Sequence, residues 1–269
     1  MNTLYFDCGM GAAGDMLTAA LLELHPDPER FVAQLNGLSL PGVHFEAEQT
    51  VRCGITGTHM AVTVHGAAEG EHHHHHEHEH EHHHHHEHHS LHDIAHIVSH
   101  LDVPESVRAD ILAVYDLIAQ AESHVHSQPV TEIHFHEVGT MDAVADVTAV
   151  CLLIHELAPE RIAASPINVG GGTVHCAHGI LPVPAPATAW LLRDIPTYGG
   201  AIQSELCTPT GASLLKHFVQ SFGAQPMMKV GHIGYGCGQK EFETANCVRA
   251  LLGEAEVQRG NNERTAPLP

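Results

Sequence analysis

The chain is 269 residues long, and 43% of these residues are hydrophobic, which is enough apolar material for one sizeable core. Its 32 Asp and Glu outnumber 11 Lys and Arg, and the formal net charge of -21 argues against nucleic acid or an anionic membrane surface as a partner. The most unusual number is the count of 30 histidines. No apolar run approaches the about 18 residues that a transmembrane helix needs, so we expect none.

The N-terminus and the cysteines both indicate a cytoplasmic protein. Residues 1–7 contain no basic segment and no cleavage site, so we expect no secretory signal. The seven cysteines are scattered and never spaced Cys-x-x-Cys, which is typical of reduced thiols rather than of a disulfide framework or a zinc site.

In chain order, the apolar periodicity predicts strands and helices that mix without a clean repeat. The expected elements are a strand at 4–6, a tight turn at 9–14, a helix at 15–24 that Pro26 and Pro28 end, a strand hairpin over 43–47 and 60–64, a helix at 91–100, a helix from Pro104, a helix from about 141 to 157, a strand at 161–163, an extended proline segment at 182–186 leading to a helix through Trp190, and a helix from Thr210.

The predicted fold class is therefore mixed α/β, a sheet with packed helices interrupted by a disordered His/Glu-rich loop. We expect residues 1–66 and 91–253 to form the core, with the His/Glu-rich loop at 67–90 between them and a flexible tail at 254–269.

Every residue from Glu71 to His89 is His or Glu, with 14 His and 5 Glu in 19 positions. Imidazole and carboxylate groups suit nickel, zinc or copper, so we expect this tract to load several ions and to release them as the pH falls toward the histidine pKa of ~6.5. The alternative is a solvated spacer that binds metal only incidentally. The predicted metal-binding residues of the tract are His72, His73, His74, His75, His76, His78, His80, His82, His83, His84, His85, His86, His88 and His89.

A second group of candidate ligands is His134, His136 and Glu137, followed by Asp142 and Asp146. A His-x-His pair on a strand places both imidazoles on one face, and residues four apart share one face of a helix. A strand-end histidine pair beside a helix-start carboxylate is a mixed nitrogen and oxygen metal site, suited to nickel, manganese or zinc. An edge strand with exposed histidines and an Asp that only complements the helix dipole is an equal alternative.

Residues 9–14, Gly-Met-Gly-Ala-Ala-Gly, match the dinucleotide-binding fingerprint after a strand and before a helix. The acidic residue expected about 20 residues later is missing from a second strand end, so we do not expect a nicotinamide or flavin site. The backbone N–H groups from Gly11 to Gly14 are candidates to hold an anion or phosphate, and a purely structural turn is the equal alternative. Asp7 and Asp15 flank this turn and are candidates to bind a metal or to cap it.

Glycine-rich junctions at 170–179 and 207–211 hold the last candidates. The second junction opens a helix and is a candidate to receive phosphate. His175, Cys176 and His178 of the first are candidate ligands or hydrogen-bonded turn residues. We interpret residues 231–238 as a flexible glycine run with no assigned chemistry.

Several of these segments together resemble the nickel insertion proteins of nickel-pincer cofactor biosynthesis. The matching blocks occur in family order between residue 4 and about residue 253, and they are Asp7-Cys8 with Gly11–Met16, His134–Gly139 with Asp142, Val169–Gly172, Ala177–Gly179, Leu181–Thr188, Thr208–Gly211 and Ile233–Gly236.

The resemblance implies a CTP-dependent cyclometallase of the lyase class. Such an enzyme inserts nickel into pyridinium-3,5-bisthiocarboxylic acid mononucleotide and forms the sulfur–carbon–sulfur nickel pincer of lactate racemase. It implies Ni²⁺ as a substrate, CTP with Mg²⁺ or Mn²⁺, and lactate racemase as the recipient of the cofactor. Family members are longer, with a C-terminal portion associated with CTP binding and oligomer formation. We therefore expect a C-terminal portion or partner chain to act with this chain, and a homo-oligomer stays open.

The resemblance also assigns roles to the candidate residues. His134, His136, Glu137 and Asp142 are expected to form the folded metal or proton-transfer site. The residues expected to approach phosphate are Gly11, Gly14, Asp15, Thr208, Thr210 and Gly211. The main alternative function is a non-catalytic nickel metallochaperone or store, with the tract as its whole function. A third interpretation is a nucleotide-dependent enzyme with an incidental metal-binding loop.

Overall fold

The computed structural model describes residues 1–68, 90–133, 135, 138–176 and 178–256. The predicted ligands of the His/Glu tract, together with His134, His136 and Glu137, lie outside these described residues. Within the described ranges, no helix combines the length and the apolar character that crossing a membrane would need.

The centre of the fold is an 8-stranded mixed sheet in the order β10-β5-β1-β12-β11-β3-β2, with β4 paired to β3. Strands β1, β5 and β10 run parallel, whereas β12 is antiparallel to both β1 and β11. Two small sheets, β6-β9 and β7-β8, lie outside it. The strands are β1 (Asn2–Asp7), β2 (Val43–Arg52), β3 (Ile55–Val64), β4 (Ala67–Ala68), β5 (Arg161–Ala164), β6 (Ile167–Asn168), β7 (Thr173–Cys176), β8 (Gly179–Pro182), β9 (Thr197–Tyr198), β10 (Ser221–Phe222), β11 (Met228–Cys237) and β12 (Cys247–Ala255).

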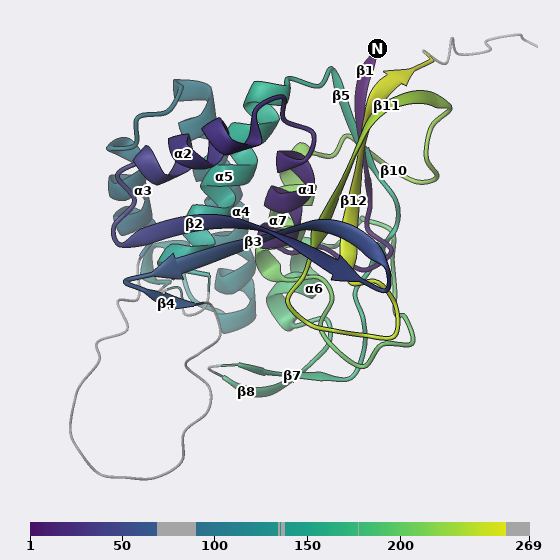
Figure 1. Cartoon of the computed structure of the whole chain (residues 1–269). Coiled ribbons are helices and arrows are strands. Elements are labelled where there is room, and N and C mark those ends of the chain that lie inside the picture. Colours follow the sequence, from purple (N-terminus) through teal and green to yellow (C-terminus); the bar gives the residue numbers. More distant parts are fainter. Residues whose placement is uncertain (69–89, 134, 136–137, 177, 257–269) are drawn as a thin grey trace, which may run out of the picture.

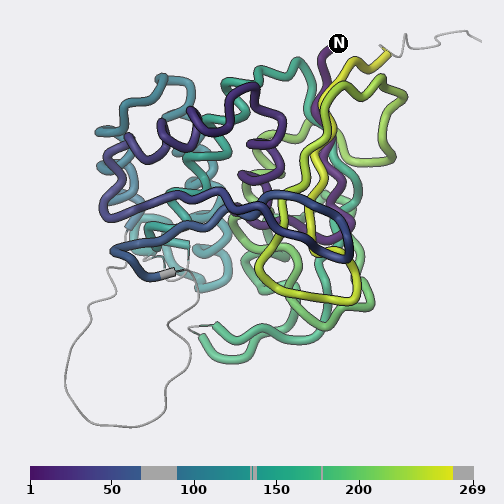
Figure 2. The backbone as a smooth tube through the Cα atoms, viewed as in Figure 1, coloured from purple at the N-terminus to yellow at the C-terminus, as the bar shows by residue number. Residues whose placement is uncertain are grey.

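The helices gather on one side of β1, β11 and β12, and the β2–β3 hairpin runs across the helical layer (Figure 1). The β7–β8 hairpin extends away from the body of the molecule (Figure 2). The helices are α1 (Gly14–Leu22), α2 (Pro28–Gly37), α3 (Leu91–Ser99), α4 (Glu105–His126), α5 (Met141–Leu157), α6 (Pro186–Leu191) and α7 (Pro209–Phe218), with a short 3₁₀ turn at Val130–Glu132. The predicted mixed α/β class is therefore confirmed.

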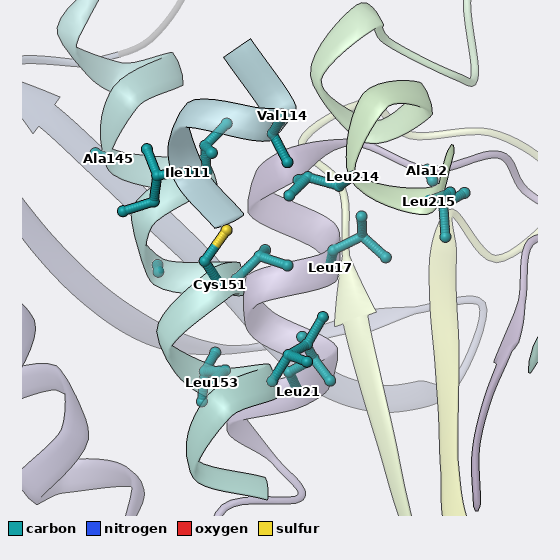
Figure 3. Packing of buried hydrophobic residues seen from close by; sticks show 14 of the residues in the cluster. Ala12, Leu17, Leu21, Ile111, Val114, Ala145, Cys151, Leu153, Leu214 and Leu215 are labelled. Atoms are coloured by element: carbon teal, nitrogen blue, oxygen red, sulfur yellow. The ribbon is translucent and has the colours of Figure 1, made fainter. Parts of the chain in front are cut away.

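The core lies between the sheet and these helices. Side chains from α1, α4, α5 and α7 meet there, and Figure 3 shows Leu17, Ile111, Cys151 and Leu214 among them. All four are at most 1% exposed. Because burial of each such side chain contributes about 1.5–3 kcal/mol, this apolar contact is the main force that holds the helices on the sheet.

Helix α1 lies unusually close to strand β11, because two glycines of β11 face it. A Cβ atom built on Gly234 would be 2.0 Å from the carbonyl oxygen of Ala20, and one on Gly236 would be 1.8 Å from that of Met16. No side chain fits in that space. The interpretation of residues 231–238 as a flexible glycine run is therefore wrong: residues 231–237 belong to β11, which has an irregularity between Val230 and His232, and Gly234 and Gly236 allow the close packing.

Two other local predictions need correction. Pro28 ends no helix but occupies the first turn of α2, where Asp27 Oδ1 accepts a hydrogen bond from the Arg30 N–H at 3.2 Å as the N-cap. The strand predicted around the His-x-His pair is wrong for its described residues, since Ile133, Phe135 and Val138 lie outside any strand.

Candidate functional site

Three segments that are far apart in the chain meet at the carboxyl end of β1: residues 8–14, 165–172 and 204–211, here called the three-loop cluster. The Ala12 N–H donates to the Leu206 carbonyl, and the Thr208 N–H donates to the Ala12 carbonyl, both at 3.0 Å. Asn168 joins the remaining segment, because its Nδ2 donates to the Gly9 carbonyl at 3.0 Å. Ligands of open α/β sheets bind beyond the carboxyl ends of parallel strands, which is where this cluster lies.

Glycines allow the three segments to approach this closely. Gly11 has φ +78°, and a Cβ there would be 1.9 Å from the Leu206 carbonyl oxygen. Gly170 has φ +82°, and its Cβ would be 1.9 Å from the Ser204 carbonyl oxygen. A Cβ at Gly211 would be 2.2 Å from the Ala12 carbonyl oxygen. These positions are therefore required by the packing of backbone against backbone.

The cluster also brings together the starts of α1, α5 and α7. The Thr208 hydroxyl caps α7 by accepting from the Gly211 N–H at 3.2 Å. Asp146 of α5 lies against Gly14, where a Cβ would be 2.4 Å from its Oδ2 atom. Since the N-terminal end of a helix carries partial positive charge, this arrangement places positive backbone ends beside buried carboxylates.

Most of the backbone N–H groups predicted to hold phosphate already donate hydrogen bonds within the protein. The Gly11 N–H donates to the Cys8 carbonyl at 2.9 Å, and the N–H groups of Ala12 and Gly211 are also used within the protein. No acceptor for the N–H groups of Ala13 and Gly14 is found among the described residues. Any anion at this turn would therefore meet the first residues of α1 rather than the whole glycine loop.

Asp15 is a buried carboxyl at the start of α1, with 8% of its surface exposed. Burial raises its pKa, whereas hydrogen bonds from the N–H groups of Met16 and Asp15 and the nearby His59 oppose that rise. His59 of β3 has Nδ1 at 3.0 Å from the Cys237 carbonyl oxygen. Because a carbonyl only accepts, Nδ1 carries the hydrogen and the lone pair of a neutral ring lies on Nε2.

His59 is a candidate site residue beside Asp15 that was not predicted from the sequence. Its neighbours Met60 and Val62 are buried and identify the strand, but an isolated histidine on its other face has no spacing signal. The carbonyl that fixes its tautomer comes from a residue 178 positions later in the chain. Only the fold brings His59 to Asp15.

Asp142 and Asp146 lie in the first two turns of α5, near the fully buried Tyr115 of α4. Burial raises the pKa of Tyr115 well above its ordinary value, and the negative charges of Asp142 and Asp146 raise it further. The Tyr115 and Phe135 rings are 5.9 Å apart between centroids, and Phe135 is fully buried. Phe135, the residue between the two predicted histidine ligands, is thus packed against α4.

Asp7 caps the turn that follows β1 and pairs with an arginine. Its Oδ1 accepts from the Gly9 N–H at 3.2 Å, and its Oδ2 accepts from Arg249 Nη2 at 2.6 Å. Burial raises the pKa of the neighbouring Cys207 thiol to about 12 and that of Cys8 well above its ordinary value, so both thiols are protonated near pH 7 and are poor nucleophiles.

His178 of the glycine-rich junction lies beside the C-terminal end of α4. His178 stacks near His126 at the end of α4, with ring centroids 4.8 Å apart, and His126 is 3.2 Å from Glu122. Cys176 makes a turn contact, with its Sγ donating to the Gly179 carbonyl at 3.5 Å. Across the residues that the structure describes, no three His, Cys, Asp or Glu side chains form a group able to hold a metal ion.

Comparison with known proteins decides the family. The family model for nickel insertion proteins matches residues 4–267. The chain belongs to the nickel insertion protein family. It is 40% identical over 257 residues to the pyridinium-3,5-bisthiocarboxylic acid mononucleotide nickel insertion protein of Clostridium kluyveri, covering 95% of this chain and 63% of that protein.

Other members of the family show the same partial coverage. A putative nickel insertion protein of Maridesulfovibrio salexigens is 40% identical over 96% of this chain and 64% of its own length. A protein of Geobacillus kaustophilus, with the same name as the Clostridium kluyveri one, is 37% identical over 94% of this chain and 60% of its own length. The chain thus spans about three fifths of the curated relatives it matches. No solved structure matches it.

Proposed function

We propose that this nickel insertion protein inserts Ni²⁺ into pyridinium-3,5-bisthiocarboxylic acid mononucleotide, and so acts as a cyclometallase of the lyase class. The observation that carries the proposal is the 40% identity, along 95% of the chain, with the Clostridium kluyveri protein named for that substrate. The three-loop cluster is consistent with it, because the N–H groups at the start of α1 lie at the carboxyl end of β1 and suit the phosphate of such a ligand.

The reaction replaces a ring C–H bond by a nickel–carbon bond. Nickel takes the two thiocarboxylate sulfurs and the ring carbon between them as ligands. The electron pair of the C–H bond stays on carbon and forms the bond to nickel, while the proton passes to a protein base and nickel remains divalent. We assign nickel binding to His134 and His136, and proton acceptance to Glu137 or Asp142. The His/Glu tract gathers the ion and supplies it.

CTP with Mg²⁺ or Mn²⁺ is proposed to bind the further portion that the longer relatives carry. The N–H groups of Gly11, Ala12 and Gly211 already donate within the protein, so the described glycine turns do not fit a triphosphate cradle. We therefore assign no step in this chain to CTP. A single phosphate of the mononucleotide suits the free N–H groups of Ala13 and Gly14 at the start of α1.

The proposal also covers the partners of the enzyme and the compartment in which it acts. A C-terminal portion, as a partner chain or as part of a longer protein, completes the active enzyme. Lactate racemase receives the finished cofactor, and the reaction takes place in the cytoplasm. Assembly into a homo-oligomer through that portion is part of the same proposal.

Two variants test these assignments: His134→Ala with His136→Ala, and deletion of residues 71–89. Each is assayed for nickel insertion with CTP and the C-terminal portion of the Clostridium kluyveri relative supplied. We expect the double alanine variant to lose at least about 100-fold in rate, and the deletion to matter only when nickel is scarce. The matched control is His92→Ala with His96→Ala, a pair of exposed imidazoles on α3.

The second candidate function is a non-catalytic nickel metallochaperone or store. The observation that favours it is the tract itself, which holds 14 of the 30 histidines. If the deletion abolishes insertion even at saturating nickel while the double alanine variant keeps full activity, the storage function is correct and the folded-site assignment is wrong.

A further inference from the structure

A cavity of about 510 Å³ lies at the end of α7 opposite to the three-loop cluster. It is lined by Arg193, Asp194, Lys216, Gln220, Ser221 and Phe222, among others, and is here called the basic pocket. Helix α7 has 10 residues, so at 1.5 Å per residue about 15 Å of helix separates the pocket from the cluster. A ligand in the basic pocket would therefore bind at a site separate from the three-loop cluster.

The pocket concentrates positive charge in a strongly acidic chain. Arg193 and Lys216 line it, and Arg161 donates from Nη2 to the hydroxyl of the lining residue Ser221 at 3.0 Å. The whole chain has only 11 Lys and Arg against 32 Asp and Glu. Nevertheless, none of these three cations forms a carboxylate ion pair within the described ranges.

Lys216 and Arg193, the two cations that line the pocket, each make a contact that leaves some of their N–H groups able to bind a ligand. Lys216 Nζ donates to the Leu191 carbonyl at 2.6 Å, and an ammonium group has two further N–H bonds. The Arg193 guanidinium lies over the Trp190 ring at 4.3 Å, which occupies its face and leaves the N–H edge for in-plane acceptors. Burial and the charge of Arg193 lower the pKa of Lys216 and the carboxylate of Asp194 only partly opposes this, so a further anion between the two cations would relieve their repulsion.

Neutral donors complete the lining. Gln220 Oε1 accepts from the Ile162 N–H at 2.5 Å, and its amide nitrogen makes no hydrogen bond with the described residues. Ser221 Oγ accepts from Arg161, so its own O–H remains able to donate. Asp194 is the one acidic lining residue, at φ +66°, a conformation that L residues rarely adopt.

We propose that the basic pocket binds the phosphate group of a phosphorylated ligand, separately from the three-loop cluster. The charged lining residues Arg193, Lys216 and Asp194 leave a net charge of about +1, and Arg161 behind Ser221 adds a further positive charge, which together suit a phosphate anion. The pocket is wide open to solvent, so a phosphate bound there can carry an organic group that extends outward. Inorganic phosphate, a mononucleotide and a nucleoside triphosphate all share this chemistry.

Isothermal titration calorimetry of the full chain, with a chelator present to strip metal, tests this proposal. Inorganic phosphate, nicotinic acid mononucleotide and CTP are titrated in parallel. We expect at least one to bind saturably, and Arg193→Gln and Lys216→Met each to weaken binding by about tenfold or more. Tighter binding of the mononucleotide or CTP than of phosphate identifies a larger ligand, whereas equal affinity identifies the free anion; both outcomes support the pocket.

Control variants separate binding from folding. Arg30→Gln removes an exposed arginine on α2 and should leave affinity unchanged, whereas Lys216→Arg should retain binding because it keeps the charge. Thermal unfolding of every variant verifies that the fold is intact. Saturable binding that survives both Arg193→Gln and Lys216→Met, or no binding by any of the three compounds at about 10 mM, would overturn the proposal. Neither outcome depends on nickel insertion, so the proposed function is judged separately.

Discussion

The two ends of helix α7 handle charge in opposite ways. At its N-terminal end, the backbone groups of the three-loop cluster are largely paired with one another, with the buried Asp15 at the start of α1 and Asp146 against Gly14. At its C-terminal end, cations without carboxylate partners line an open cavity. The first end is closely packed and should tolerate little change, whereas the second is where we propose that an anion binds and should accept substitution. Measurements at each end can break this contrast or sharpen it.

The largest expected effect comes from Gly211→Ala at the start of α7. The new methyl group would be 2.2 Å from the Ala12 carbonyl oxygen, so α7 or the glycine turn must move. We expect a loss of about 3–5 kcal/mol in the free energy of unfolding, measured by urea denaturation. Gly37→Ala in α2 is the matched control, because nothing lies within 4 Å of its Cβ position. It should be neutral or stabilising by up to about 1 kcal/mol, and an equal loss in both variants would contradict the rigid cluster.

A smaller effect concerns the pH dependence of stability at the buried carboxyl. Burial raises the pKa of Asp15 in the folded state, so the folded protein binds this proton more readily than the unfolded chain. Its contribution to stability is therefore present at low pH and is lost as the pH rises through the folded-state pKa. Asp15→Asn should remove this loss, so the stability of the variant relative to the native protein should increase from about pH 4 to pH 7. A constant difference across that range would show that the carboxyl is not perturbed.

Two tyrosines provide the next comparison. The Tyr5 hydroxyl donates to the Gly223 carbonyl at 3.1 Å, whereas the Tyr115 hydroxyl, beside the α5 carboxylates, has no hydrogen-bond partner in the described residues. Tyr5→Phe should cost about 1 kcal/mol, and Tyr115→Phe should be neutral or stabilising. Urea denaturation of both variants measures the difference. A larger loss for Tyr115→Phe would indicate a polar partner for that hydroxyl in the native protein.

The smallest effect is expected at the other end of α7. Lys216→Met removes one hydrogen bond to the Leu191 carbonyl and also removes a cation crowded by Arg193. These changes oppose each other, so the free energy of unfolding should stay within about 1 kcal/mol of the native value. Thermal and urea unfolding verify this. A loss as large as that of Gly211→Ala would show that both ends of α7 are equally intolerant.

Local pattern was sufficient for much of the fold but not for the parts that depend on distant contacts. The spacing of Leu17 and Leu21 identifies α1, although the whole helix is buried, and the apolar alternation through Phe45 and Val62 identifies the β2–β3 hairpin. Helix α2 was missed because Pro28 was interpreted as a stop, although the same residue type favours the first turn of a helix. Strand β11 was missed because its glycines have no side chains to show alternation.

In the candidate site too, local sequence indicated the individual segments but not the contacts between distant residues. Its glycine turns and helix starts were recognisable one at a time, but their meeting depends on contacts between residues such as Ala12 and Leu206, which are far apart in the chain. The role of Gly11 and Gly211 in close packing could not be separated from phosphate binding without those neighbours. His59 gave no local signal at all. The assignments of His134, His136 and Glu137 remain predictions, since these residues lie outside the described part of the chain.

The paired hydrogen bonds between Ala12, Leu206 and Thr208 have a consequence for how the site responds to a ligand. Ala12 donates to one of these residues and accepts from another, so the loops cannot separate without breaking both bonds. The amide protons of Ala12 and Thr208 should therefore exchange with solvent through one shared opening event. A ligand that binds at any one loop would slow hydrogen exchange at both amides, so binding at one loop would stabilise the other loops of the cluster as well.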